Sequence, residues 1–260
     1  IDEVGSQLAS ILNYNKLSKG RYIHFSVDDV STCLDDIKAN QSTYTSVFNN
    51  AFLSGLKNLH DSYGAVFSLY CYVDNLASMP TKFQSELKSN SNWLKFGIHS
   101  NNGSHSFEQS LPGDAITSYN NFVSRILTLT GTTNSIDRIP RLHTFAGNLD
   151  AIRAMRDCNC GILGAITAEY EHTIMSFGAR ESYYLSNAQK THINTHHKLI
   201  DIVNGLVFFP TSIRTDWFSS SAEWSIAYPT SNGDIAKLIQ DYDALALHGD
   251  KLYTLEIFGH

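Results

Sequence analysis

One stretch decides the fold: Tyr22-Ile23-His24-Phe25-Ser26-Val27-Asp28-Asp29-Val30. Its aromatic and β-branched residues, bounded by Gly20 and Ser31, predict a strand. Side chains that are neighbours on a strand point to opposite faces, so Asp28 and Asp29 can share one role only where the strand ends. A solvated turn with Ser31 or an aspartate as N-cap is the structural alternative. A strand that ends in acids and opens into a helix is also where α/β folds place their chemistry.

The composition fits one large α/β domain over residues 1–260, with enough chain to bury a substantial core. The net charge of −6 and the lack of a basic patch argue against a nucleic-acid partner. No apolar run approaches the ~20 residues of a membrane span, and no signal segment is evident, so the compartment is left open. Ser, Thr, Asn and Tyr dominate the polar residues, which suits an uncharged polymer such as a glycan.

The four cysteines are too few for a disulfide scaffold. Cys158 and Cys160 are spaced too closely for the usual zinc pair, and no second pair accompanies them. We therefore expect Cys33, Cys71, Cys158 and Cys160 to be buried or partly buried thiols.

Strand-like and helix-like segments alternate along the chain, and Asn204-Gly205 predicts a tight turn between two of the strands. Residues 170–197 are polar, and we expect an irregular surface excursion there. No repeat or linker divides the sequence, so the alternation predicts one barrel-like α/β domain. The expected strands are 22–28, 65–73, 93–99, 139–145, 161–166, 199–203, 205–210 and 251–260, and the expected helices are 2–13, 43–61, 80–89, 114–129, 148–157 and 234–245.

Polar side chains recur at the ends of the expected strands. Asp28-Asp29 ends the first strand, His99 the third, Arg141-Leu142-His143 the fourth and His260 the last. In a parallel barrel these ends share one face, so residues far apart in sequence converge there. Aspartate and neutral histidine are suitable ligands for a divalent metal such as zinc.

Four segments resemble, in order, the motifs of the polysaccharide deacetylases (carbohydrate esterase family 4, NodB-homology domain). They are Phe25-Ser26-Val27-Asp28-Asp29, Phe96-Gly97-Ile98-His99-Ser100, Pro140-Arg141 and Ile257-Phe258-Gly259-His260. The resemblance extends over residues 22–260. It implies a deformed, seven-stranded (β/α) barrel of the glycoside hydrolase/deacetylase type. It also implies metal-assisted removal of an acetyl group from an acetylated carbohydrate, with zinc as the expected ion.

The resemblance also implies roles for individual residues. Asp28 matches the general base, Arg141 the arginine that orients it, and His260 the general acid, for which His248 is the alternative. Asp29 and His99 match metal ligands. In the fourth motif, Asp216 would be the partner of the arginine and Trp217 would form a wall of the substrate groove.

The third metal ligand is open between His105 and His143. The family pattern places its second histidine four residues after the first, but here Gly103 occupies that position and His105 lies six residues after His99. We favour His143 because it lies at a strand end and needs no loop to deliver it.

Two other functions remain alternatives to a deacetylase. A metal-free glycoside hydrolase on a similar barrel would need a second strand-end acid about 5–10 Å from Asp28, and Glu169 is the best candidate. A barrel that binds carbohydrate without catalysis is the other. Metal content separates these two functions and the deacetylase from one another. The sequence does not predict the oligomeric state.

Overall fold

The computed structural model describes residues 22–168, 182–196, 198–211, 213–214 and 254–259, which form a mixed α/β fold. Helices expected at 2–13 and 234–245 lie outside these residues. The alternation of strands and helices predicted from the sequence is confirmed for most of the described part. No described helix is long and apolar enough to cross a membrane.

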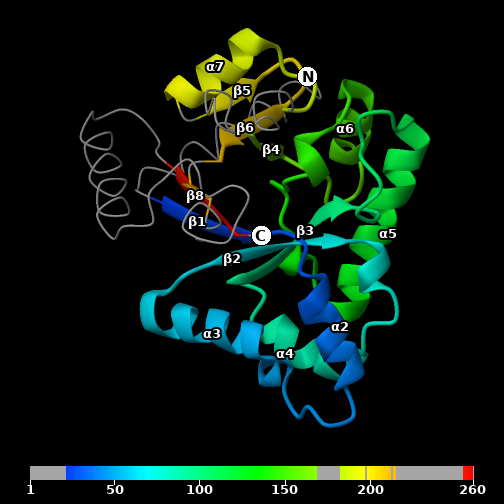
Figure 1. Ribbon diagram of the computed structural model, residues 1–260. Coiled ribbons are helices and arrows are strands. Elements are labelled where there is room, and N and C mark those ends of the chain that lie inside the picture. Colours follow the sequence, from blue (N-terminus) through cyan, green and yellow to red (C-terminus); the bar gives the residue numbers. More distant parts are fainter. Residues whose placement is uncertain (1–21, 169–181, 197, 212, 215–253, 260) are drawn as a thin grey trace.

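Five parallel strands form the larger sheet, in the order β3-β2-β1-β8-β7 (Figure 1). The expected strand around Phe25 is β1, and it pairs with β2 on one side and β8 on the other. Because all the pairings are parallel, the carboxyl ends of these strands lie along one edge. The bounds are β1 Tyr22–Val27, β2 Phe67–Tyr72, β3 Leu94–Ser100, β7 Ile213–Arg214 and β8 Thr254–Gly259.

Helices α2, α3 and α4 lie together below the larger sheet in the view of Figure 1. Their apolar side chains, such as Leu34, Leu53 and Leu87, are buried in the same core cluster as the strand residues Leu69 and Phe96. This packing fixes the sheet from one side. The bounds are α2 Ser31–Ala39, η1 Val47–Asn49, α3 Ala51–Tyr63, η2 Asp74–Leu76, η3 Thr81–Phe83 and α4 Gln84–Ser89.

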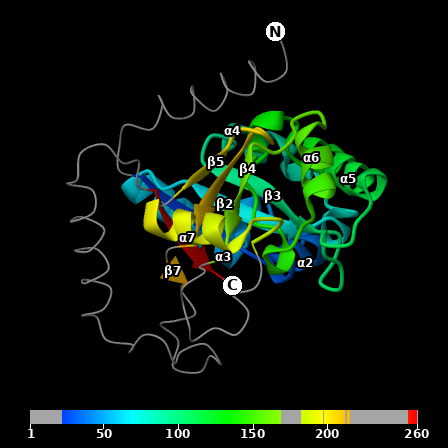
Figure 2. The ribbon, with the colours of Figure 1, turned by 90° about the horizontal axis from the view of Figure 1, so that it is seen from above.

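A second sheet has the order β4-β6-β5, with β5 and β6 antiparallel around the expected Asn204-Gly205 turn. Seen from above, α5 and α6 lie side by side at one end of the fold, and α7 lies near the other (Figure 2). Asn148 caps α6, because its Oδ1 accepts from Ala151 N at 2.8 Å. The bounds are α5 Pro112–Thr130, η4 Thr133–Ser135, α6 Leu149–Arg156, β4 Gly164–Thr167, α7 Asn187–His196, β5 Leu199–Asp201 and β6 Leu206–Pro210.

Two predictions need correction. No regular strand covers 139–145, because Pro140 has no N–H to donate and the chain turns into η5, His143–Phe145. The preceding segment is nevertheless hydrogen bonded to both sheets: Asp137 N donates to Phe96 O at 2.8 Å, and Ile166 N donates to Pro140 O at 3.0 Å. Within 170–197, the described residues include helix α7 instead of an entirely irregular excursion.

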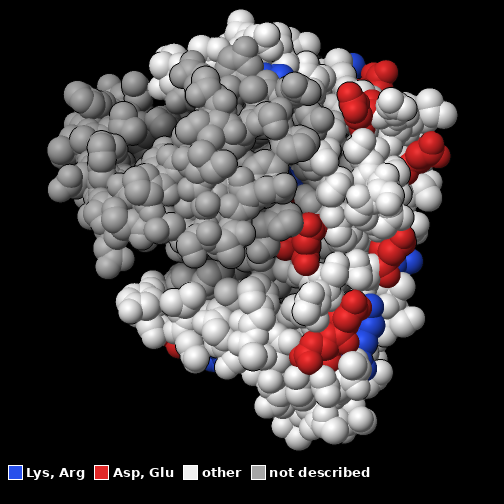
Figure 3. Space-filling view, viewed as in Figure 1, with Lys and Arg blue, Asp and Glu red and all other residues white. Residues whose placement is uncertain are grey.

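The described strands form two sheets, and a closed seven-stranded barrel stays a prediction. The prediction for the thiols is confirmed. Cys33 and Cys71 are buried, Cys158 and Cys160 are partly buried, and all four are free. Figure 3 shows acidic side chains in separate places over a largely uncharged described face.

Candidate metal and acid–base site

The site begins at the carboxyl end of β1. Val27 is the last strand residue, and Asp28 and Asp29 follow before α2 begins at Ser31. Asp28 is buried, whereas Asp29 takes the left-handed conformation with φ 52° and its side chain is 29% exposed. A non-glycine residue in this region is strained by about 1 kcal/mol or more. Because the strand ends at Val27, both carboxylates can face one site: Asp28 Oδ2 and Asp29 Oδ1 lie 3.8 and 3.6 Å from His99 Nε2.

Arg141 holds Asp28 through a bidentate ion pair. Its Nη2 and Nε donate to the two carboxylate oxygens at 2.7 and 2.9 Å. A further bond runs from Nη1 to Ser26 Oγ at 3.1 Å, and the guanidinium lies 5.2 Å from the centre of the Tyr70 ring. Both charged groups are buried, so each satisfies the other where water does not reach.

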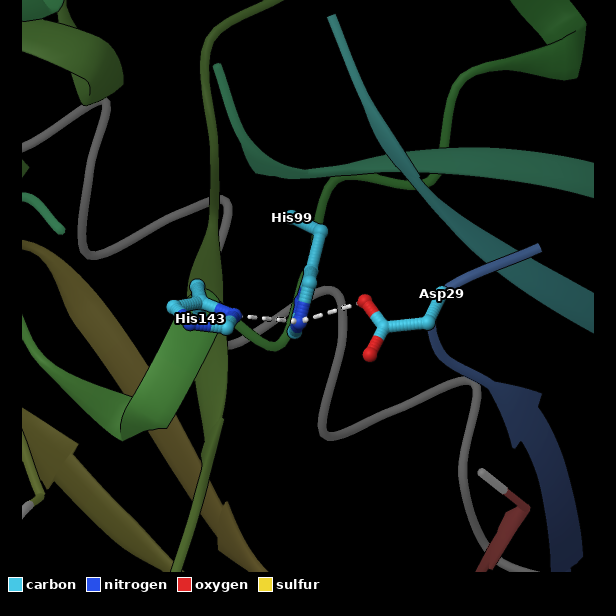
Figure 4. Close-up of side chains that lie close together, drawn as sticks. All are labelled: Asp29, His99 and His143. Atoms are coloured by element: carbon cyan, nitrogen blue, oxygen red, sulfur yellow. Dashed lines mark hydrogen bonds and ion pairs between the residues drawn. The ribbon is translucent and has the colours of Figure 1, made fainter. Parts of the chain in front are cut away.

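Asp29, His99 and His143 converge next to this pair. One ligand atom from each residue lies within 4.8 Å of the others. The Nε2 atom of His99 is 3.6 Å from Asp29 Oδ1 and 3.3 Å from His143 Nδ1. Figure 4 shows the His99 ring between the other two side chains. Asp28 Oδ2 is also 3.8 Å from His99 Nε2, so the carboxylate held by Arg141 lies beside the cluster.

The orientation of the His99 ring is fixed by a hydrogen bond on the side that faces away from Asp29 and His143. Its Nδ1 lies 2.7 Å from the backbone oxygen of Arg141, which can only accept, so we assign the ring proton to Nδ1. The Nε2 lone pair then faces Asp29 and His143. The pairing of β2 with β3 is irregular here, since Cys71 pairs with Ile98 but Tyr72 pairs with Ser100. Such a bulge re-aims side chains, and in this position it gives His99 its direction.

The three side chains fit a divalent metal ion. Carboxylate oxygen and imidazole nitrogen are common zinc ligands, and two of them bound at ~2.0–2.1 Å on a tetrahedral ion stand ~3.3 Å apart. The spacing of 3.3 Å between His99 Nε2 and His143 Nδ1 matches that value. A backbone carbonyl behind a ligating histidine is the usual second contact of such a ligand. Three protein ligands also leave a coordination position open, as in catalytic sites.

His105 lies in a different environment. Its Nδ1 is 2.8 Å from Ser100 Oγ, and its Nε2 is 3.4 Å from Ser110 Oγ. The ring also packs edge-on against Phe107, with centroids 4.9 Å apart. Burial lowers the pKa of His105, which favours its neutral form in the folded protein. Of the two candidates for the third ligand, His143 is the one that the structure brings to Asp29 and His99.

Tyr72 is a site residue that the sequence analysis missed. Its hydroxyl is 3.0 Å from His143 Nδ1 and hydrogen bonds to the Asp29 carboxylate. Burial, followed by that bond, raises the pKa of the phenol, so it stays protonated. The sequence carried one signal for it: Tyr70 and Tyr72 are two residues apart on β2, so their side chains point to the same face of the strand.

A second polar layer lies beneath Arg141. The single O–H of Tyr70 lies within hydrogen-bonding distance of two acceptors, Ile139 O at 2.9 Å and Asp137 Oδ2 at 3.2 Å. His24 Nε2 is 3.6 Å from Asp137 and 2.9 Å from Ser68 Oγ. Burial acts to raise the pKa of Asp137, but hydrogen bonds from His24 and Ser68 outweigh it and the pKa is lowered. The Tyr70 ring, which lies beneath Arg141, is therefore anchored by the ionised carboxylate of Asp137.

The other predicted site residues lie outside the described part of the chain. These are His260 and its alternative His248, the groove residues Asp216 and Trp217, and Glu169. Strand β8 ends at Gly259, which pairs with Val27, the residue before Asp28.

No protein-family model and no curated protein matches this sequence. Among solved structures, the chain is similar to a protein from Mycobacterium smegmatis assigned as a polysaccharide deacetylase. The TM-score is 0.46 and the sequence identity 11%, over 93% of this chain and 77% of that one. This likeness is too distant to carry a functional argument, which therefore rests on the residues of the site.

Proposed function

We propose that this protein is a metal-dependent hydrolase that removes acetyl groups from an N- or O-acetylated carbohydrate. One observation carries the proposal: Asp29, His99 and His143 converge at a strand edge beside the buried pair of Asp28 and Arg141. A metal site next to a fixed carboxylate is the arrangement that metal-assisted hydrolysis of an amide or ester requires.

The proposal includes a deformed seven-stranded barrel. Two features of the fold support closure. The segment 136–140 hydrogen bonds to β3 on one side and to β4 on the other. Strands β6 and β7 are separated by only two residues, yet β6 pairs with β4 in the smaller sheet and β7 pairs with β8 in the larger one. The chain from β6 to β7 therefore joins the two sheets at the edge of the larger sheet opposite β3.

Each residue has a role in this mechanism. Asp29, His99 and His143 would hold a divalent ion, for which zinc is the first choice because of the mixed nitrogen and oxygen ligands. When bound, the ion supplies Lewis-acid activation of a water molecule and of the acetyl carbonyl. Asp28 would take the proton of the attacking water, and Arg141 fixes the direction of its carboxylate.

The remaining steps rest on residues that resemble the family motifs. His260 would protonate the leaving group, a contribution of roughly 10²–10⁴-fold. The register of β8 supports this role, because Gly259 lies beside the strand residue that precedes Asp28. Asp216 and Trp217 would complete the carbohydrate groove near Arg141.

The substitution Asp28→Asn tests the proposal. Wild-type protein should bind one equivalent of zinc by elemental analysis and release acetate from acetylated chito-oligosaccharide or acetylated xylan. The Asp28→Asn variant should keep the metal and lose turnover. Asp36→Asn is the matched control, because Asp36 is a hydrogen-bonded carboxylate on α2 that takes no part in the site.

Two outcomes would contradict the assignment. Near wild-type acetate release by Asp28→Asn would remove the residue from the base role. If wild-type protein binds carbohydrate but no metal, the assignment as an enzyme is wrong and the protein is a carbohydrate-binding barrel.

A further inference from the structure

Tyr72 projects into the candidate metal site from β2. Its side chain is buried, and the ring packs against both histidines, with centroids 5.3 Å from His99 and 5.7 Å from His143. The irregular pairing of Tyr72 with Ser100 places this ring at the same bulge that directs His99. Gly103 lies near the phenol, because an added Cβ there would be 3.6 Å from the hydroxyl.

The hydroxyl contacts two of the three candidate ligands. An ionised carboxylate only accepts hydrogen bonds, so the phenol O–H donates to Asp29. The phenol oxygen also lies 3.0 Å from His143 Nδ1, so the hydroxyl contacts the atom that His143 offers to an ion. A phenol is protonated at neutral pH, so the group is a neutral donor. The hydroxyl can therefore fix the Asp29 carboxylate next to the His143 ring.

Asp29 needs such a contact more than His99 does. The side chain of His99 is 4% exposed and its ring is tied to a backbone carbonyl, whereas the side chain of Asp29 is 29% exposed. Asp29 also sits in the strained left-handed region, at φ 52°. A partly exposed carboxylate on a strained residue has more freedom to turn away from the cluster.

We propose that Tyr72 is the positioning residue of the metal site: its hydroxyl holds the Asp29 carboxylate beside the His143 ring, in the arrangement that receives a divalent ion. The proposal rests on the metal site of the proposed function. Contacts that orient metal ligands in this way typically change metal affinity by 10–100-fold.

The test is zinc affinity, measured by competition with a chromogenic chelator, for wild-type protein and Tyr72→Phe. The phenylalanine keeps the ring and removes only the hydroxyl, so the dissociation constant should rise by about 10–100-fold. Tyr44→Phe is the matched control. The Tyr44 hydroxyl also donates to a carboxylate, that of Asp36 at 2.7 Å, but this pair takes no part in the site. The control should bind zinc as wild type does.

A double variant separates positioning from general loosening. If Tyr72 acts through Asp29, adding Tyr72→Phe to Asp29→Asn should weaken zinc binding by only about twofold more. A full second loss, or unchanged affinity in Tyr72→Phe alone, would overturn the proposal. Wild-type protein that binds no zinc would instead overturn the proposed function.

A measurement on wild-type protein covers the case in which Tyr72→Phe does not fold. With tyrosines labelled at Cζ with ¹³C, one equivalent of zinc should shift a tyrosine signal, because the hydroxyl contacts two ligands. Zinc binding that leaves every tyrosine signal in place would refute the role of Tyr72.

Discussion

Replacing Arg141 with methionine would test how strongly the buried ion pair is coupled. Arg141 is 1% exposed and Asp28 6% exposed, and two hydrogen bonds of 2.7 and 2.9 Å join them. Methionine fills part of the volume but carries no charge. The Asp28 carboxylate would then be buried without its cation, and Ser26 would lose the donor at 3.1 Å.

The expected loss is large. Removing one partner of a buried ion pair costs about 3–5 kcal/mol, because the remaining charge stays desolvated. Solvent screening reduces this value little, since neither group reaches a tenth exposure. A domain of ordinary stability has about 5–15 kcal/mol in total, so Arg141→Met would remove a substantial part of it.

Urea unfolding, followed by circular dichroism and extrapolated to water, measures this loss. Arg138→Met is the control, because Arg138 donates to the backbone oxygen of Gly161 at 2.7 Å and should cost only about 1–3 kcal/mol. Combining Arg141→Met with Asp28→Asn should recover part of the stability, because the buried charge is removed. A loss below about 1 kcal/mol, or a double variant equal to the sum of the single losses, would refute the reasoning.

Two further predictions concern packing and pH. Gly97→Ala would place a Cβ 2.3 Å from Cδ1 of the Tyr70 ring, so urea unfolding should show a loss of about 1–3 kcal/mol, whereas Gly113→Ala, with open space around it, should be nearly neutral. Burial holds the pKa of His105 below its usual 6.5, so its stabilising contribution is fully present above pH 6.5 and is lost as the pH falls from 6.5 through the lower pKa of the folded state. His105→Gln should flatten this part of the pH dependence in urea unfolding, and an unchanged slope would contradict the prediction.

The pattern of apolar residues along the sequence predicted those strands and helices whose apolar side chains are buried in the core. Strands β1, β2 and β3 begin and end within two residues of the expected bounds, and α5 lies where its apolar period indicates. The pattern failed at α7, whose sequence Asn187–His196 has a weak apolar face with Ile193 buried. Such a helix depends on tertiary contacts, which a local period does not report.

The strand-end rule found most of the candidate site because parallel strands finish at a common edge. It placed Asp28, Asp29 and His99 together without any knowledge of the turns that follow them. Tyr72 was missed for a physical reason: every residue of β2 is buried, so its sequence resembles an ordinary apolar strand. The contacts of its hydroxyl and ring, next to the irregular pairing with Ser100, show that the phenol faces the ligands.

The choice between His105 and His143 shows why spacing alone was insufficient. His105 lies in a loop and is held by Ser100, so moving it to the cluster would break a hydrogen bond of 2.8 Å. His143 follows Leu142, whose N–H donates to the Tyr183 hydroxyl at 3.2 Å and whose side chain is fully buried. The backbone before His143 is therefore fixed by the fold, and the ring reaches His99 without any rearrangement. His99 and His143 are therefore preorganised, so of the three ligands it is mainly the Asp29 carboxylate that remains to be ordered when an ion binds.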